Sequence, residues 1–551
     1  MDTDPEKNPS SPTFTHTPHP YGPPPIPHIS LRRRRLISQI LLGVAFFSIA
    51  GWVVWGMDAA GDGGGVGTGR PIDMGIPGIP LGADGTPYPI LFEPDPTSSS
   101  SPSPTSDQDP NPDPNHVLSH AEKMAAQGKI KPQSWGLDLN PDHLTAGLSP
   151  WPQKPQVNES KEPLSVLGHF ADRIYDYGPV GKEEYSRVMR EFVKVAFPKA
   201  AHTVLLSGLD HFLDSSSPSS SSSSSSSEEG DWAWDKEKFI WQTDKDDQRS
   251  DSPEVKSWRD WKTTNEKWEW DLLTDADAEK WVKKVLAGSR MREVWDALPS
   301  GILRADMLRY LLLLLRGGIY SDTDTTLLKP PSKWGAPPTT PPTLFNNGDG
   351  WLTPAQKARL ERGEEQEEVL GRASVVVGVE ADVGEREDWY DWWPRPIQIV
   401  QWTMSSHPSH PIPLSALLRI LHATSSALHW SHTNAHIIHL LLDQGRYKDA
   451  KALAEVTAMN EVKNGGPVGV MGWTGPGVWT DAVLGWLRVG WGVRWVDLRG
   501  LREPMRVGDV LILPVTGFSP GVGNFGAQQR GHPQAMVEHG FAGSWKTHGE
   551  P

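Results

Sequence analysis

Two aspartates, Asp322 and Asp324, have the side chains and the spacing best suited to chemistry in this sequence. They come shortly after Ile319 and Tyr320, an apolar pair that we expect to begin a short buried strand. Residues two apart on a strand point to the same side, so both carboxylates should face one point. A hard divalent cation prefers oxygen ligands of this kind. A site with only two or three protein ligands also leaves coordination positions open for a diphosphate.

The segment before these aspartates has the pattern of a helix. Apolar residues recur at helical spacing, at Leu303, Met307, Tyr310, Leu311 and Leu314. This pattern predicts a helix over 300–315, and Gly317-Gly318 supplies the left-handed ending that helices favour. Asp306 and Arg309 are three residues apart, so they share a face of the helix and can reach the same cleft. The two aspartates could alternatively be solvated acids in a turn, but this framing favours a metal site.

Residues 36–57 form an uncharged apolar run that is long enough to cross a membrane as one helix. Four consecutive arginines, Arg32 to Arg35, precede it, and Asp58 and Asp62 follow. The positive-inside rule predicts that the N-terminus is cytosolic and that everything after residue 57 is lumenal. The alternative is a cleaved signal peptide, whose apolar region and preceding segment are normally shorter than these.

Composition divides the rest of the chain. Residues 1–35 are typical of a cytosolic tail, and 58–235 of a lumenal stem with a partly helical neck (160–213) and a poly-Ser linker (215–227). A core-forming pattern runs over 236–551, which suffices for one large α/β domain. The net charge of −15 argues against a nucleic-acid partner. The absence of cysteine excludes thiol nucleophiles, thiolate metal sites and disulfides.

Several blocks of the sequence resemble a known enzyme family. In chain order they are Phe239–Thr243, Trp268–Asp275, Arg304–Tyr310, Val376–Asp382, Gln398–Trp402, Trp473–Asp481, Phe518–Gly521 and Gly543–Trp545. With the two aspartates, they resemble the fungal initiation-specific α-1,6-mannosyltransferases and their relatives, whose shared region is called the DXD sugar-binding domain. The resemblance implies a GT-A fold, an α/β domain whose Rossmann-like sheet binds the nucleotide at the carboxyl ends of its strands.

The resemblance also implies roles for single residues. Asp322 and Asp324 would hold Mn²⁺ against the diphosphate of GDP-mannose, and His539 would complete the metal site. The alternative for His539 is a surface histidine near a chain end. Other side chains would contact the donor: Trp241 near the guanine, Asp306 and Arg309 at the sugar and ribose, and Ser544 and Trp545 over the diphosphate.

The implied reaction is a retaining transfer of mannose from GDP-mannose to an N-linked glycan, as the α-1,6-mannose that initiates or extends the outer chain. Breaking the anomeric bond leaves negative charge on GDP, which a metal ion and Arg309 can stabilise. No side chain is an obvious nucleophile, and this favours attack from the front face. The carboxylates expected in catalysis are Asp322, Asp324, Glu380, Asp382 and Asp481, and the alternative for the last three is that they cap turns.

Two other functions fit parts of the pattern. One is a mannosyltransferase that acts on inositol-phosphoceramide sphingolipid, but relatives of that kind tend to have further hydrophobic segments, and none follows Asp324. The other is a non-catalytic subunit of a Golgi mannan-synthesising complex, which would not need to keep both aspartates. We therefore expect a single-pass type II Golgi membrane enzyme with a lumenal catalytic domain, which other mannosyltransferases could join in a complex.

Two further features do not belong to the family pattern. Residues 337–372 are expected to be a surface insert. His429, His432, His436 and His439 have the spacing of one helical stripe. Such a stripe can bind metal, but no carboxylate accompanies it in the sequence, so a surface stripe is the favoured interpretation.

Overall fold

The computed structural model describes residues 128–151, 167, 178–179, 181–214, 232–264, 268–334, 342–345, 352–383, 389 and 393–541. All of these ranges belong to one compact unit, Ile72–Pro551. The predicted membrane segment at 36–57, the poly-Ser linker at 215–227, Ser544 and Trp545 lie outside the described residues. Within the described ranges, no helix combines the length and the apolar character needed to cross a membrane.

A mixed sheet, rich in parallel pairs, forms the centre of the fold. Among the described residues, nine strands join in the order β2-β1-β3-β8-β6-β10-β9-β5, and β7 pairs with β6. The pairs β1–β2, β1–β3 and β6–β10 are parallel, whereas β8 runs antiparallel between β3 and β6. The strands are β1 (Phe239–Asp244), β2 (Glu269–Thr274), β3 (Gly318–Ser321), β5 (Thr343–Leu344), β6 (Val375–Asp382), β7 (Ile397–Ile399), β8 (Thr403–Ser406), β9 (Met505–Val507) and β10 (Val510–Leu513).

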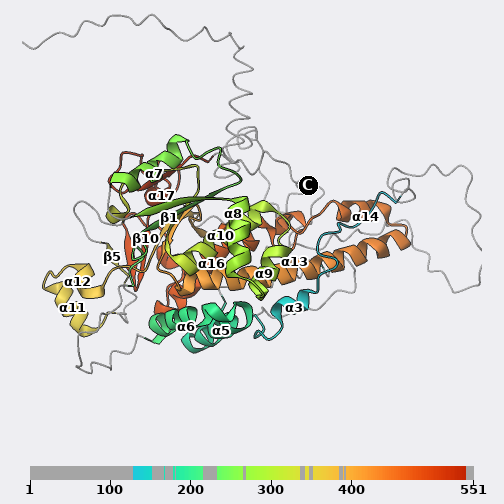
Figure 1. Ribbon diagram of the computed structural model, residues 1–551, viewed down its shortest axis with the longest axis horizontal. Coiled ribbons are helices and arrows are strands. Elements are labelled where there is room, and N and C mark those ends of the chain that lie inside the picture. The colour runs from blue at the N-terminus through green and yellow to red at the C-terminus, as the bar shows by residue number, and fades with distance from the viewer. Residues whose placement is uncertain are drawn as a thin grey trace, which may run out of the picture. The chain divides into compact units, whose positions relative to one another are not determined.

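Helices cover both faces of this sheet (Figure 1). Side chains alternate along a strand, so Val375 and Val377 of β6 pack into the core under the helices α10 (Gly301–Arg316), α13 (Pro411–Asp443) and α16 (Pro476–Trp491). Val376 points the other way, into the core shared with α7 (Pro253–Thr264) and α17 (Val515–Phe518). Three layers of this kind confirm the α/β class.

The other helices lie around these layers. The α-helices are α3 (Pro141–Thr145), α5 (Lys182–Ala196), α6 (Lys199–Asp214), α8 (Asp275–Val285), α9 (Arg290–Ala297), α11 (Pro354–Glu361), α12 (Gln366–Leu370), α14 (Tyr447–Ala454) and α15 (Gly469–Trp473). The described residues also form three short 3₁₀ helices, η2 (Pro331–Lys333), η4 (Val462–Asn464) and η5 (Trp495–Leu498).

The connection between α10 and β3 requires glycine. The predicted helix and strand are confirmed, and Gly317 and Gly318 join them with φ of 69° and 88°. A Cβ at Gly318 would lie 2.3 Å from the carbonyl oxygen of Phe239, and one at Gly317 would lie 2.4 Å from Cδ of Pro408. The two glycines therefore let the chain leave the helix and run directly beside β1.

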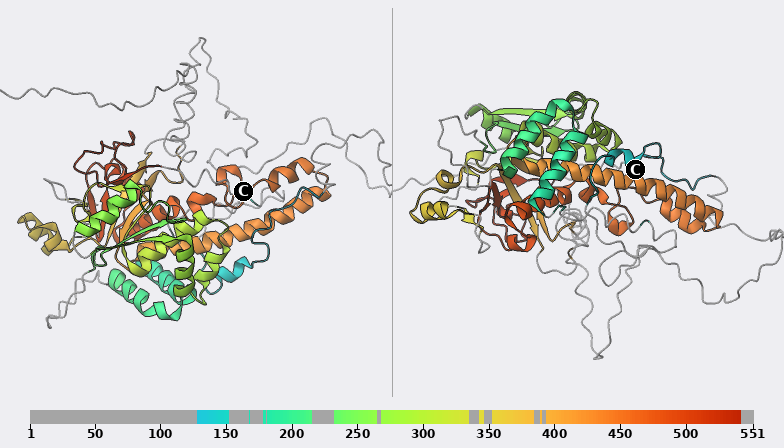
Figure 2. Two further views of the ribbon diagram at one scale, coloured as in Figure 1. Left: turned by 45° about the horizontal axis from the view of Figure 1, so that its top comes forward. Right: turned by 90° about the horizontal axis from the view of Figure 1, so that it is seen from below.

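The helices of the predicted neck share one compact unit and one core with the sheet, so the structure does not divide the chain at the predicted boundary of 236. Tyr185 of α5 packs against Trp486 of α16, with ring centroids 5.9 Å apart, and its hydroxyl donates to the carbonyl of Pro411. Met189 and Phe192 are fully buried in the same core. The right-hand view of Figure 2 shows α5 and α6 crossing α13, with which both are in contact. In the sequence, a low-complexity tract separates these helices from residue 236. In the structure, they share one hydrophobic core with the elements that follow it.

The two features outside the family pattern lie at the surface. Helix α11 buries none of its side chains, as expected for an insert. In the histidine stripe, His436 and His439 are exposed, while His429 Nε2 lies 3.0 Å from Asp142 Oδ1 and His432 contacts the carbonyl of Gly136. A carboxylate therefore does accompany His429, from a helix distant in the sequence, but the stripe is no metal cluster among the described residues.

Candidate active site

Asp322 and Asp324 follow the end of β3, as predicted, but they lie in a tight turn before β4 (Thr325–Leu327), so the alternation of a strand does not apply to them. The turn is closed by Thr325, whose backbone N–H and hydroxyl both donate to the carbonyl of Asp322. It is also anchored at its sides, because Asp322 N–H donates to the carbonyl of Trp402 and the Thr323 hydroxyl donates to Asp244. A closed turn replaces strand alternation as the reason why both carboxylates serve one site.

His539 joins these two aspartates. It ends β11 (Val537–His539), which pairs antiparallel with β4 and places His539 opposite Thr325. Its Nε2 lies 3.2 Å from Asp324 Oδ1, and one ligand atom from each of the three residues falls within 4.8 Å of the others. Two carboxylates and an imidazole are a donor set that Mn²⁺ accepts. The geometry therefore favours the metal-ligand interpretation of His539 over that of a surface histidine.

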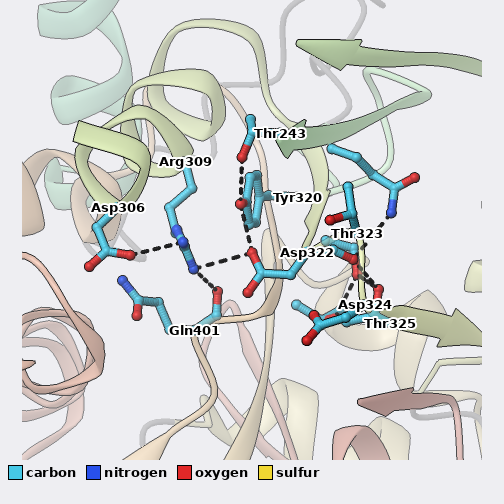
Figure 3. Close-up of polar contacts among 12 residues, drawn as sticks. Thr243, Asp306, Arg309, Tyr320, Asp322, Thr323, Asp324, Thr325 and Gln401 are labelled. Carbon is cyan, nitrogen blue, oxygen red and sulfur yellow. Dashed lines mark hydrogen bonds and ion pairs between the residues drawn. The ribbon is translucent and has the colours of Figure 1, made fainter. Parts of the chain in front are cut away.

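Arg309 connects the helix α10 to this group (Figure 3). One guanidinium nitrogen lies 2.8 Å from Asp306 Oδ1, and another lies 3.4 Å from Asp322 Oδ1 and donates to the carbonyl of Gln401. The other oxygen of Asp306 accepts a hydrogen bond from Thr474. Asp306 and Arg309 thus share the cleft of the two aspartates, as the helical spacing predicted.

Tyr320 is a further member of the site. Its hydroxyl donates to Asp322 Oδ1 over 2.7 Å and lies 2.9 Å from the hydroxyl of Thr243 at the end of β1. The guanidinium of Arg309 stands 4.9 Å from the centroid of its ring. Asp322 Oδ1 is therefore held from two sides (Figure 3). Sequence reasoning missed this role, although Tyr320 lies two positions before Asp322, and side chains two positions apart along a strand point to the same side.

Burial sets the charges of this cleft. It raises the pKa of Asp306 to about 6, against the opposing effect of Arg309, and it raises the pKa of Asp322, which Asp324 raises further. Burial disfavours the charged form of Arg309, but the neighbouring Asp322, Tyr320 and Asp306 outweigh it and hold the Arg309 pKa above its usual value. Three carboxylates, those of Asp306, Asp322 and Asp324, lie around the single guanidinium of Arg309. A bound divalent cation would therefore favour the ionised forms of these carboxylates.

Glu380 and Asp382 lie two residues apart on β6 and have different surroundings. Burial raises the pKa of Glu380 to about 7, with Gln398 and the more distant His539 opposing. Glu380 Oε2 has no hydrogen-bond partner among the described residues. Asp382, in contrast, accepts a hydrogen bond from the backbone N–H of Gly500 over 2.6 Å. Glu380 is therefore the carboxylate of the two that lies within electrostatic reach of the metal-ligand group.

Two predicted site residues have structural roles instead. Asp481 is 2% exposed on α16, and both of its oxygens bind Arg395, so it cannot reach an acceptor as predicted. Trp241 is 5% exposed, stacks on Phe239 with centroids 3.7 Å apart, and donates its indole N–H to the carbonyl of Gly317. The predicted guanine contact of Trp241 is therefore wrong, because its ring belongs to the core beside the helix–strand connection.

Comparison with known proteins places this site in a recognised region. Residues 239–340 match the family described as a glycosyltransferase sugar-binding region containing a DXD motif. That range contains Asp306, Arg309, Asp322 and Asp324, whereas His539, Glu380 and Trp402 lie beyond it. No solved structure matches the chain.

The chain is also similar to curated fungal proteins. It is 36% identical over 313 residues to the initiation-specific α-1,6-mannosyltransferase of Schizosaccharomyces pombe, covering 56% of this chain and 63% of that protein. It is 30% identical over 332 residues to the protein of the same name from Candida albicans, covering 57% and 73%. The Saccharomyces cerevisiae protein of that name is 30% identical over 317 residues, covering 46% and 65%. The chain thus spans under two thirds of the first and third of these relatives.

Proposed function

Because the chain belongs to the family of initiation-specific α-1,6-mannosyltransferases, we propose that it is a Mn²⁺-dependent, retaining mannosyltransferase. It takes mannose from GDP-mannose and adds it to an N-linked glycan, as the α-1,6-mannose that initiates or extends the outer chain. The observation that carries this proposal is the grouping of Asp322, Asp324 and His539 beside Arg309.

The three ligand residues would hold the cation. When bound, Mn²⁺ supplies a Lewis acid that stabilises the negative charge left on GDP. Asp322 is already held by Tyr320 and Arg309, so little reorganisation is needed before substrate binds. Arg309 is fixed in turn by Asp306, and we expect this pair to contact hydroxyls of the donor sugar and ribose. Ser544 and Trp545, outside the described residues, remain our candidates to close over the diphosphate.

The proposed reaction needs no enzymic nucleophile. The acceptor hydroxyl oxygen forms the new bond to the anomeric carbon on the face from which GDP departs, and the departing phosphate oxygen takes the hydroxyl proton. GDP-mannose is α-linked and the product is α-linked, which is consistent with retention. Glu380, which has a buried carboxylate oxygen without a hydrogen-bond partner among the described residues and lies within the electrostatic influence of His539, stays our first candidate to contact the acceptor. Asp382 is a second candidate on the same strand.

The location of the enzyme is also a proposal. The apolar run at 36–57 behind four arginines supports a single-pass type II anchor in the Golgi membrane, with the catalytic domain in the lumen. N-linked glycans pass through that compartment on their carrier proteins. Other mannosyltransferases are candidate partners of such an anchored enzyme.

The test uses the full chain, a Man₈GlcNAc₂ N-glycan, GDP-mannose and Mn²⁺. We expect the glycan to gain one hexose that α-1,6-mannosidase removes. Asp322→Ala/Asp324→Ala should abolish the gain, whereas Glu367→Ala/Glu368→Ala, which removes two exposed acids of α12, should not. Replacing Mn²⁺ by EDTA should have the effect of the first double variant.

Other results would change the proposal in defined ways. Hydrolysis of GDP-mannose without transfer to the glycan would keep the enzyme and reject this acceptor, and transfer to inositol-phosphoceramide would identify the sphingolipid alternative. A folded chain that neither transfers nor hydrolyses would reject the enzyme in favour of a non-catalytic subunit.

A further inference from the structure

We propose that Trp402 is a positioning residue that fixes the imidazole of His539, so that its Nε2 faces the metal. This inference rests on the metal site proposed above. Trp402 lies in the bend between β7 and β8, outside the range that matches the DXD family, and its contacts reach both ligand-bearing segments, the aspartate turn and β11.

The indole of Trp402 forms a platform for the imidazole. The two rings are stacked, with centroids 4.4 Å apart and planes 9° from parallel. The indole cannot turn freely, because its N–H donates to the carbonyl of Phe518 over 3.1 Å and only 9% of Trp402 is exposed. Phe541 packs edge-on against His539 from another direction, with centroids 4.2 Å apart. The imidazole therefore rests on a flat surface whose own orientation is fixed.

The backbone does not supply this orientation. Pairing of β11 with β4 sets His539 opposite Thr325, and Gly540 N–H donates to the carbonyl of Asp324. These bonds place the Cα atom of His539 but leave the torsions of its side chain free. The stack restricts those torsions to the ones that keep the ring flat on Trp402.

A hydrogen bond does not supply it either. In most metal sites the second nitrogen of a histidine ligand donates to a carboxylate or carbonyl, which fixes the ring. His539 Nδ1 is buried and has no hydrogen-bond partner among the described residues. The stack on Trp402 takes the place of that bond.

The same residue also contacts Asp322 through its backbone. The carbonyl of Trp402 accepts the hydrogen bond from Asp322 N–H over 2.8 Å. A side-chain substitution leaves this carbonyl in place, so a change at position 402 tests the stack on His539 rather than the anchoring of the aspartate turn.

The experiment measures Mn²⁺ binding to the full chain by electron paramagnetic resonance of free Mn²⁺, without donor or acceptor. Trp402→Met keeps an apolar side chain but removes the flat ring, and we expect about tenfold weaker binding, the lower end of the usual cost of losing an orienting contact. Trp402→Leu repeats the test with a branched apolar side chain of similar size. Trp402→Phe keeps an aromatic face and should bind Mn²⁺ nearly as tightly as the unaltered chain. Phe541→Leu, which removes an edge-on ring from both His539 and Trp402 but leaves the two stacked rings themselves, should cost less than Trp402→Met.

A double variant decides whether Trp402 acts through His539. His539→Ala should weaken binding by itself, and adding Trp402→Met to it should cost nothing more. Equal Mn²⁺ binding by Trp402→Met and the unaltered chain, or the same loss with and without His539, would overturn the inference. If Asp322→Ala/Asp324→Ala also leaves Mn²⁺ binding unchanged, the proposed metal site itself is wrong. Thermal unfolding of the metal-free variants shows that each compared protein is folded.

Discussion

Two buried clusters of aspartate and arginine occur in this domain, and they have opposite compositions. In the candidate site, Arg309 of α10 lies between two acids, Asp306 and Asp322. In the core beside α16, one acid, Asp481, lies between two arginines, Arg395 at hydrogen-bonding distance and Arg419 at 3.8 Å. The first cluster has an excess of negative charge and the second an excess of positive charge.

This difference separates a binding site from a structural ion pair. Buried charge of one sign is costly unless an opposite charge compensates it. The Arg309 cluster includes a ligand of the candidate metal site, so a cation can compensate its surplus acid. The Asp481 cluster is buried in the core, and the carboxylate of Asp481 already compensates part of the positive charge of Arg395 and Arg419. The same Asp→Asn substitution should therefore cost activity in one cluster and stability in the other.

The largest expected effect is on turnover. Asp322→Asn should lower kcat/KM for mannosyl transfer by about 10³-fold, because a neutral amide binds a divalent cation poorly. Stability should change little, since burial already disfavours the charge of Asp322. Glycan mass spectrometry and chemical unfolding of the same samples provide the two readouts. A large loss of stability in Asp322→Asn would remove the contrast with Asp481.

Next is Asp481→Asn, which should lower the free energy of unfolding by about 3–5 kcal/mol, because two buried guanidinium groups lose their shared anion. Urea unfolding measures this change, and the activity of the remaining folded fraction should stay close to that of the unaltered chain. If activity falls and stability does not, Asp481 is a catalytic residue after all.

A smaller effect concerns pH. The Glu380 pKa is raised to about 7, so between its usual value of 4.5 and 7 the folded chain keeps a proton that the unfolded chain has released. Stability from this group should therefore be complete below that window and fall as pH rises through it. Between pH 5 and pH 7.5 the unaltered chain should therefore lose about 1–3 kcal/mol of its free energy of unfolding. Glu380→Gln should not show this loss. Urea midpoints in EDTA at both pH values measure it, and parallel curves for the two proteins would contradict it.

The smallest effect is expected where the same chemistry is exposed. Arg187 and Glu191 form an i,i+4 pair on α5, with the arginine side chain 54% exposed. Arg187→Ala should change the free energy of unfolding by less than about 0.5 kcal/mol. A change as large as that of Asp481→Asn would show that burial does not govern the strength of these pairs.

Local pattern was enough to predict part of the domain. The helix ending at Arg316, the glycine pair and the strand after it follow from spacing and from the conformational freedom of glycine, and they bring Asp306 and Arg309 to the two aspartates. The prediction of His539 as a metal ligand follows from the family resemblance and not from local pattern. The pairing of β11 with β4 brings His539 to the two aspartates, as that prediction requires.

Contacts between distant segments were not predictable in this way. The burial of Trp241 and the capture of Asp481 by Arg395 depend on how helices pack on the sheet, which no local spacing encodes. The role of Trp402 depends on a stack with a residue far along the chain. The packing of α5 and α6 on the later elements could not be predicted either, because the serine-rich tract that follows α6 in the sequence is typical of a domain boundary.

The pairing of β11 with β4 has a consequence for the order in which the enzyme matures during synthesis. The two aspartates are made long before His539, so a nascent chain that has already formed the α10–β3 unit still lacks the third ligand. The proposed metal site is completed only after the ribosome has passed residue 539 and the late strand has closed a long loop onto β4. Catalytic competence is thus coupled to near-complete synthesis of the domain, and a chain that stops before β11 would be able to fold in part but not to gain the complete ligand set.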